Sequence, residues 1–304
     1  MPEQQDLNDL AYFAWVVDAG GFAPAGRRHG VPKSKLSRRI KALEERLGVR
    51  LLQRSTRRFS VTSTGETFYR HCKAVLQEAE AAHEAVNLRH GEPCGVVRLS
   101  CPVTLLHFAI GDMLNDFLRM YPRVSVELDA DNRRVDVIGE GMDVALRVRF
   151  PPLKDSDLVM RKLGASHQIL VATPTLLDEL GRPSTPEDLA RLPSLATKTH
   201  KANPQWQLLN VRGEERRIEY SPRLVSDDMH ALRQAALAGL GVVQLPVMAI
   251  REPLAAGALE RVLPEWAPPP GVVHAVFASR RGMLPAVRKL VDFLAEKYQV
   301  HDVR

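Results

Sequence analysis

The chain has 304 residues, of which 45% are hydrophobic and 26% are charged, so it is long enough for two or three compact units with cores of their own. Its formal net charge is +6, and the whole excess lies in residues 1–62, which carry 12 basic and 6 acidic residues against 30 of each in the remainder. Positive charge confined to one segment predicts a binding site for a polyanion, with nucleic acid as the first candidate.

The same sequence argues against a secreted or membrane protein. The start, MPEQQDLNDL, is acidic where a secretory signal is first basic and then apolar. No stretch approaches the roughly 20 apolar residues that a membrane span needs. The cysteines, Cys72, Cys94 and Cys101, form no CxxC pair and are too few for a disulfide framework. We therefore expect a reduced, cytoplasmic protein without a membrane partner.

Three short helices are predicted in the first 48 residues. The first ends at residues 20–21 and carries an apolar face at helical spacing, formed by Leu7, Leu10, Phe13, Ala14 and Val17. The second opens at residues 23–24, where a proline suits the first helical position, and a break follows at residues 30–32. The third covers residues 33–47 and has Gly48 as its stop.

The third predicted helix has the character of a helix that reads DNA. Its apolar stripe, at steps of four, three and four residues, consists of Leu36, Ile40, Leu43 and Leu47. The face that cannot be core is basic and rich in hydroxyls, and it consists of Lys33, Ser34, Ser37, Arg38 and Lys41. A helix fits the major groove, where Arg bonds guanine bidentately and Ser bonds a base or a phosphate. Two helices joined by a short turn, the second with such a face, predict a helix-turn-helix.

Residues 51–62, LLQRSTRRFSVT, alternate between apolar and polar side chains around Arg54, Arg57 and Arg58. This alternation predicts a small two-stranded wing whose arginines lie on backbone phosphates. The alternative is a solvated basic helix on some other fold. We favour the DNA-binding interpretation because the charge, the turn and the wing occur together.

A long helix is predicted to follow, beginning at a capping-box pattern from Ser63 to Glu66 and ending near residues 89–91. Apolar residues recur in it with a period of 3.5 residues, which is the seam of a coiled coil. This seam consists of Phe68, Cys72, Val75, Ala79, Ala82 and Val86. A second copy of the same helix is the simplest partner for the seam, and the alternative is an amphipathic helix that lies on its own domain. Cys72 is interpreted as a small core residue.

Beyond residue 95 the pattern changes to alternating strands and helices, which predicts an α/β fold with parallel strands and helices on both faces of a sheet. The strands of the first series are expected at residues 96–101, 124–128 and 144–148, and its helices at residues 110–121 and 135–139. A second series has strands at residues 167–172, 206–209 and 242–245 and helices at residues 174–180 and 228–238. A final strand is expected at residues 272–278 and a final helix at residues 284–298.

Several motifs in residues 6–66 keep a fixed spacing without a gap. They are residues 6–10, 25–28, 36–40, 42–44 and 47–48, then Leu51-Leu52-x-Arg54-x-x-Arg57 and Thr62-x-x-Gly65-Glu66. The N-terminal part therefore resembles the LysR-type transcriptional regulators. Looser similarity to the effector domain of that family continues at residues 135–137, 143–147, 185–189 and 238–246.

The resemblance implies a winged helix-turn-helix in residues 1–62, a dimerising coiled-coil linker helix in residues 63–90, and a two-lobed effector domain in residues 91–304. The effector domain would resemble a periplasmic binding protein, with one lobe formed by residues 95–162 and 268–304 and the other by residues 163–267. The residues assigned to DNA contacts are Arg28, Lys33, Ser34, Lys35, Ser37, Arg38, Lys41, Arg54, Arg57 and Arg58. Departures from the family pattern, which predict altered DNA contacts, are Gly21, Ala23, His29, Pro32 and Lys35.

Catalytic and metal-binding patterns are not evident in the sequence. There is no GxSxG, no HExxH and no phosphate loop, and the pair Gly239 and Gly241 precedes a strand and lacks the third glycine of a dinucleotide site. Asp227 and Asp228 could be paired acids, but we expect one of them to cap the following helix. We therefore expect no enzyme activity, no cofactor and no metal site.

Ligand sensing remains as the function of the α/β lobes. Two such lobes leave a cleft at the C-terminal ends of their strands, where helix N-termini attract anions. By similarity to the family, the candidate effector-binding residues are Ser100, Pro102, Val103, Thr104, Arg147, Thr199 and His200. Each has a structural alternative, such as a plain helix cap for Thr104 or an ion pair for Arg147. Cys101 lies beside this site and is interpreted as a buried, inert thiol.

These observations predict a DNA-binding transcriptional regulator that acts as a homodimer, assembled further into a homotetramer, and that responds to a small, anionic effector. One alternative is an effector-independent regulator whose lobes serve only oligomerisation, which a featureless apolar cleft would favour. Another is a solute-binding protein or enzyme on the same lobes, against which the basic N-terminal unit argues. The operator, the regulated genes, the effector and the sign of regulation are not encoded in any readable pattern.

Overall fold

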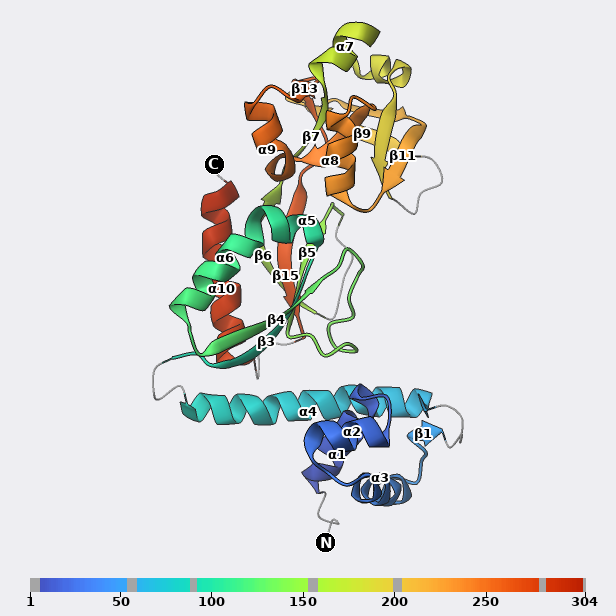
Figure 1. The fold of residues 1–304 in the computed structure, drawn as a ribbon, viewed down its shortest axis with the longest axis vertical. Coiled ribbons are helices and arrows are strands. Elements are labelled where there is room, and N and C mark those ends of the chain that lie inside the picture. Colours follow the sequence, from blue (N-terminus) through green and yellow to red (C-terminus); the bar gives the residue numbers. More distant parts are fainter. Residues whose placement is uncertain are drawn as a thin grey trace.

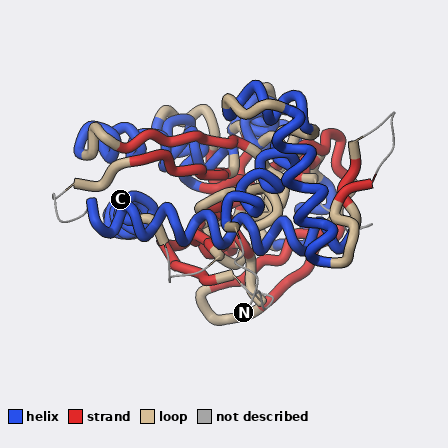
Figure 2. The backbone as a smooth tube through the Cα atoms, turned by 90° about the horizontal axis from the view of Figure 1, so that it is seen from below, coloured by secondary structure: helices blue, strands red, loops and turns tan. Residues whose placement is uncertain are grey.

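The structure, a computed structural model of the full chain, describes residues 6–53, 59–87, 92–152, 158–198, 204–278 and 283–302. It has three parts arranged along the longest axis, namely a helical N-terminal unit and two α/β lobes (Figure 1). Lobe 1 comprises residues 95–166 and 271–302, and lobe 2 comprises residues 168–267. The long helix of the N-terminal unit crosses the base of lobe 1, so that in the view from below the N-terminal helices lie in front of the strands (Figure 2).

The N-terminal unit has the predicted order of three helices, a wing and a long helix. Its elements are α1 (Leu7–Asp18), α2 (Phe22–His29), α3 (Lys33–Leu47), the antiparallel wing strands β1 (Leu52–Gln53) and β2 (Ser60–Val61), and α4 (Ser63–Asn87). Its core consists mainly of Phe13, Ala14, Val16, Ala25, Leu36, Ile40, Leu43 and Leu51. The third helix has the predicted bounds, and Gly48 ends it in the left-handed region with φ 68°.

Two local expectations for this unit were wrong. Leu7 was expected in the core face of α1 but is 60% exposed, because the helix instead turns Asp9 and Val16 inward. The cap of α4 is Thr62 rather than Ser63, since the Thr62 hydroxyl accepts a hydrogen bond from the Gly65 amide (2.9 Å) and donates one to the Arg50 carbonyl (2.8 Å). The first turn of α4 is thereby tied to the chain that enters the wing.

Lobe 1 is a five-stranded sheet with helices packed on it. Its elements are β3 (Gly95–Cys101), α5 (Val103–Leu105), the π-helical turn η2 (Leu106–Ile110), α6 (Gly111–Met120), β4 (Val124–Ala130), β5 (Val144–Arg149), β6 (Val159–Ser166), β15 (Gly271–Phe277) and α10 (Pro285–Asp302). The strand order is β4-β3-β5-β15-β6, in which β4, β3 and β5 are parallel and β15 runs antiparallel to both of its neighbours. The main core of the lobe lies between this sheet and the helices α6 and α10.

Lobe 2 repeats the same plan. Its elements are β7 (Gln168–Ala172), α7 (Pro174–Leu180), the 3₁₀ turn η3 (Pro186–Arg191), β8 (Ser194–Thr197), β11 (Pro222–Ser226), α8 (Met229–Leu237), β12 (Val242–Pro246), α9 (Val247–Ala255) and β13 (Glu260–Val262). The order β11-β8-β12-β7-β13 again combines three parallel strands with an antiparallel strand, β7, next to them. A small antiparallel sheet is added by β9 (Gln205–Asn210), β10 (Glu215–Glu219) and β14 (Trp266–Ala267).

The two-lobed α/β architecture confirms the predicted fold class, although the sheets are mixed rather than purely parallel. The antiparallel strands β7 and β15 come directly after the two crossings between the lobes, so each enters its sheet from the opposite end. The first crossing lies at His167, beyond the predicted boundary at residue 162, because β6 continues to Ser166. The strands β6, β8, β10, β11, β13 and β14 and the helix α9 were not predicted.

The helix predicted at residues 135–139 is a turn instead. The side chain of Asp136 accepts a hydrogen bond from the Gly139 amide (3.1 Å), and Glu140 accepts one from the Asp136 amide (2.8 Å). Such local bonds from side chains to the backbone compete with those of a helix. The chain then turns at Gly141, whose φ of 67° lies in the left-handed region that favours glycine.

Candidate functional site

The exposed face of α3 carries the residues that were predicted to contact DNA. Leu36, Ile40 and Leu43 are at most 2% exposed and fix the orientation of the helix. The predicted residues on this helix are all exposed, and they are Lys33, Ser34, Lys35, Ser37, Arg38 and Lys41; Arg28 on α2 is exposed as well. This placement leaves a basic, hydroxyl-bearing helix face open to a groove of DNA.

Two further arginines of α3 have a different environment. Asp9 of α1 is 1% exposed, and its carboxylate accepts hydrogen bonds from Arg39 Nε (2.6 Å) and Arg46 Nη2 (3.3 Å). Arg39 also pairs with Asp6, and the hydrogen bond to Asp9 is the main reason why the pKa of Arg39 is raised. These contacts join α1 to α3, and Arg39 and Arg46 thereby hold α3 in place.

The wing is positioned by Glu44, which lies in the motif at residues 42–44 but was given no role there. The Glu44 carboxylate of α3 accepts hydrogen bonds from the Leu51 amide (2.7 Å) and the Leu52 amide (2.9 Å). Strands β1 and β2 then pair through Leu52 with Val61 and Gln53 with Ser60. The wing arginines themselves, Arg54, Arg57 and Arg58, lie outside the described residues.

A row of aromatic rings borders the exposed face of α3, and it also escaped prediction. The His29 imidazole stacks on Trp15 with ring centres 4.1 Å apart and planes within 3°, and Trp15 meets Tyr12 edge-on. The Lys35 ammonium lies over the Tyr12 ring, 5.8 Å from its centre. Burial lowers the pKa of His29, which favours the neutral ring. The departures His29 and Lys35 thus belong to one surface, which includes part of the exposed face of α3.

The predicted seam of α4 divides into two halves. Phe68 and Cys72 contact the core of the N-terminal unit, where Cys72 is 1% exposed and the Phe68 ring lies 5.6 Å from that of Phe13. These two residues therefore do not form a free seam, and the alternative of a helix lying on its own domain holds for this half. Val75 is 40% exposed and Ala79 is exposed too. The side chains of Ala82 and Val86 lie outside the described residues.

A cleft of about 230 Å³ lies between the two lobes. Lobe 1 lines it with Pro102, Thr104, Leu105, Asn132, Val148, Phe150 and Ser166. Lobe 2 contributes Gln168, Thr197, Lys198, Asp227, Met229, Pro246 and Met248. Apolar side chains and a few polar groups converge here, as they do in binding sites for small molecules.

The polar groups of the cleft centre on the start of α5. The first amides of a helix have no partner within it, and that of Val103 donates to Asn132 Oδ1 (3.2 Å). The Asn132 Nδ2 group in turn donates to the Asp227 carbonyl of lobe 2 (2.9 Å). Thr104 and Leu105 follow Val103 and line the cleft, and Lys198 brings a positive charge from lobe 2.

Three of the predicted effector-binding residues do not line this cleft. Ser100 is 3% exposed within β3 and does not line the cleft, and Val103 does not line it either. Arg147 lies on the face of β5 opposite to Val148, and its guanidinium donates to the Val135 carbonyl (2.8 Å) on that other side. Pro102 and Thr104 do line the cleft as expected. Thr199 and His200 lie outside the described residues.

The remaining candidate sites have structural explanations. Asp228 caps α8 by accepting a hydrogen bond from the His230 amide (2.8 Å), as expected for this acidic pair. Burial raises the pKa of Cys72 to about 12 and also raises that of Cys101, so both thiols stay protonated. Within the described residues no group of three or more His, Cys, Asp and Glu side chains could hold a metal ion. None of the helices in the described part of the chain has both the length and the apolar character needed to span a membrane.

A winged helix-turn-helix, a long helix and a two-lobed α/β unit with a central cleft define a DNA-binding regulator with a ligand-binding domain. Family models agree with this class, since residues 7–66 match the bacterial regulatory helix-turn-helix protein of the lysR family and residues 90–299 match the LysR substrate binding domain. The chain belongs to the LysR family of transcriptional regulators. Regulators of this family bind DNA and small-molecule effectors and form oligomers.

Individual relatives match along almost the whole chain. An HTH-type transcriptional regulator of Xanthomonas campestris pv. campestris is 35% identical over 96% of this chain and 85% of its own length. PtxR, an HTH-type transcriptional regulator of Pseudomonas aeruginosa, is 33% identical over 96% of this chain and 92% of its own. The full-length structure of the Vibrio cholerae virulence activator AphB has 30% identity and a TM-score of 0.61, covering 97% of this chain and 100% of that chain.

Proposed function

We propose that this regulator recognises promoter DNA through the exposed face of α3 and the wing, and that a small anionic molecule in the interlobe cleft modulates this recognition. The division of labour among the arginines of α3 carries the DNA-binding half of the proposal. Arg39 and Arg46 are engaged by the buried Asp9, whereas Arg38 is exposed to solvent. The anchored arginines fix the helix, and Arg38 supplies a guanidinium for base edges or phosphates.

The exposed half of α4 supports binding as a dimer, with a tetramer as the further assembly. Helix-turn-helix proteins read two half-sites with two copies of the recognition helix. Val75 and Ala79 are exposed on α4 and leave a small apolar surface that its own domain does not cover. A second copy of α4 is the occupant that we propose for this surface. Since the partner of the regulator is chromosomal DNA, the cytoplasm is its proposed location.

The lining of the cleft supports an effector with an acidic group and an apolar body. The start of α5 offers backbone amides, and the Thr104 hydroxyl and the Lys198 ammonium can add donors for an anion. Leu105, Phe150 and Met248 supply the apolar part of the lining. A regulator without an effector would have a featureless cleft, and the converging polar groups favour a ligand-responsive regulator over that alternative.

Selection of DNA duplexes from a random pool by the full-length wild-type protein tests the proposed recognition. We expect enrichment of a limited set of sequences that contain two related half-sites, because a dimer presents two recognition helices. Failure to enrich any sequence over repeated rounds would contradict specific recognition. Enrichment of unrelated sequences whose binding depends only on salt would indicate contacts to phosphates alone.

A further inference from the structure

One amide side chain at the edge of the cleft joins the two lobes. Asn132 follows β4, and its Oδ1 atom accepts the Val103 amide at the start of α5 while its Nδ2 group donates to the Asp227 carbonyl of lobe 2. A primary amide can act as acceptor and donor at once. The position of Asn132 is therefore sensitive both to what occupies the start of α5 and to the distance between the lobes.

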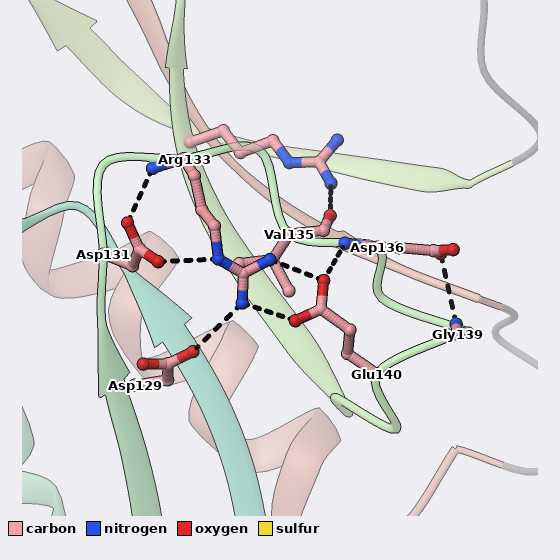
Figure 3. A network of polar contacts seen from close by, with 8 residues as sticks. Asp129, Asp131, Arg133, Val135, Asp136, Gly139 and Glu140 are labelled. Atoms are coloured by element: carbon pink, nitrogen blue, oxygen red, sulfur yellow. Dashed lines mark hydrogen bonds and ion pairs between the residues drawn. The ribbon is translucent and has the colours of Figure 1, made fainter. Parts of the chain in front are cut away.

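Arg133, the residue next to Asn132, forms a network of contacts that holds a compact loop together. Arg133 bonds Asp131 through Nε (2.7 Å) and Glu140 through both terminal nitrogens (2.7 and 2.5 Å), and it lies 3.9 Å from Asp129 (Figure 3). The Glu140 carboxylate also accepts the Asp136 amide. We call residues 131–141 the clamp loop. Single surface ion pairs contribute little, but a bidentate arginine within a network fixes geometry more strongly.

The far end of the clamp loop lies against the linker helix. Gly141 is buried, and a Cβ atom added to it would lie 3.3 Å from Lys73 Nζ and 3.4 Å from Lys73 Cε of α4. Lys73 also pairs with Asp18 of α1 (3.1 Å), and the Tyr69 hydroxyl donates to the same carboxylate. The clamp loop thus begins beside the cleft and ends on the helix that carries the DNA-binding unit.

We propose that the clamp loop couples the cleft to the linker helix, with Asn132 as the residue that senses the ligand and the contact between Gly141 and Lys73 as the output. Asn132 lines the cleft, so a ligand there that bonds its side chain competes with the Val103 amide and the Asp227 carbonyl and weakens the bridge between the lobes. The Arg133 network makes the loop move as one piece, so that Gly141 shifts against Lys73. The inference rests on the proposed function, because it explains how that cleft regulates DNA binding.

The size of such coupling is bounded by linkage. A ligand shifts the arrangement of the linker helix only by the ratio of its affinities for the two arrangements. Couplings between sites typically amount to about 5–150-fold in affinity. The contacts along this route are few, polar and exposed, and we therefore expect a coupling within that range of affinities. A merely structural role for the clamp loop would stabilise lobe 1 and leave α4 unaffected.

Hydrogen exchange of the full-length protein, without DNA or ligand, separates the two roles. We expect Asn132→Ala and Asn132→Asp to accelerate exchange at the amides of Glu140, Gly141 and Met142 by about fivefold or more, and also at the α4 amides around Lys73. The aspartate retains an acceptor for Val103 but places a carboxylate oxygen against the Asp227 carbonyl. Unchanged protection in β3 confirms that the fold is intact.

Two matched variants complete the test. Asp116→Asn, in an exposed ion pair with Arg119 on α6, should leave α4 unchanged. In a Lys73→Met background, the Asn132 variants should still loosen the clamp loop but no longer change exchange in α4. Coupling is refuted if the Asn132 variants affect the loop alone or alter nothing. Because this measurement contains no DNA, it supports or refutes the coupling even if duplex selection fails and the proposed function falls.

Discussion

The buried Asp9 offers a sharp test of how the recognition helix is held. Replacing Asp9 with Asn removes the charge and weakens two charge-assisted hydrogen bonds, from Arg39 (2.6 Å) and Arg46 (3.3 Å). Hydrogen bonds to charged groups are each worth roughly 1.5–3 kcal/mol. The side chains of Arg39 and Arg46 are 33% and 25% exposed, so water can partly replace the lost partner. We therefore expect a loss of about 2 kcal/mol in the opening free energy of the N-terminal unit.

Hydrogen exchange at the amides of Leu36 and Ile40 measures this loss directly. A change of about 2 kcal/mol corresponds to exchange faster by roughly thirtyfold. Asp116→Asn is the matched control, because its partner Arg119 is 78% exposed and such pairs contribute about 0–1 kcal/mol. Exchange in α3 within about twofold of the wild type for Asp9→Asn would refute the anchoring of the helix by Asp9.

Three further outcomes follow from the described contacts. Val75→Glu should leave the fold intact, since this side chain is 40% exposed, but should yield a smaller particle in sedimentation. An unchanged sedimentation coefficient would exclude this surface from the dimer. Arg133 lowers the pKa of Glu140 to about 2. The stabilisation from this pair is therefore complete above the ordinary pKa near 4.5 and is lost as the pH falls from there towards 2. The variant Glu140→Gln should remove that part of the pH dependence of thermal unfolding. In a thermal-shift screen of small carboxylates, a carboxylate that binds should stabilise the wild type and Arg147→Gln by about 2.7 kcal/mol at 100 times its Kd, but should not stabilise Lys198→Gln. Stabilisation of Lys198→Gln but not of Arg147→Gln would place Arg147 in the site.

Local patterns carried most of the correct predictions. The bounds of α3 and α7 followed from periodicity and from the proline and glycine residues beside them. The charge confined to residues 1–62 pointed to the DNA-binding unit before any fold was known. In each of these cases the signal and the structure that it specifies lie within a few residues of one another.

The errors arose where the partner of a residue is distant in sequence. A heptad-like stripe on α4 predicts burial but does not identify the surface that covers it, and the N-terminal unit covers Phe68 and Cys72. Arg147 does not line the cleft, because the face that it occupies depends on the register of β5 with β15. The bridge from Asn132 to Asp227 spans 95 positions and left no local pattern to read.

The central claim is that α3 reads DNA through its exposed face, and the affinity of Arg38→Ala for a duplex selected by the wild type tests it most directly. We predict a loss of about 1–3 kcal/mol at a given salt concentration together with relaxed preference at one base position. Arg119→Ala on lobe 1, which removes an exposed positive charge outside the N-terminal unit, should bind like the wild type. Equal affinity of Arg38→Ala and wild-type protein across salt concentrations would contradict the account.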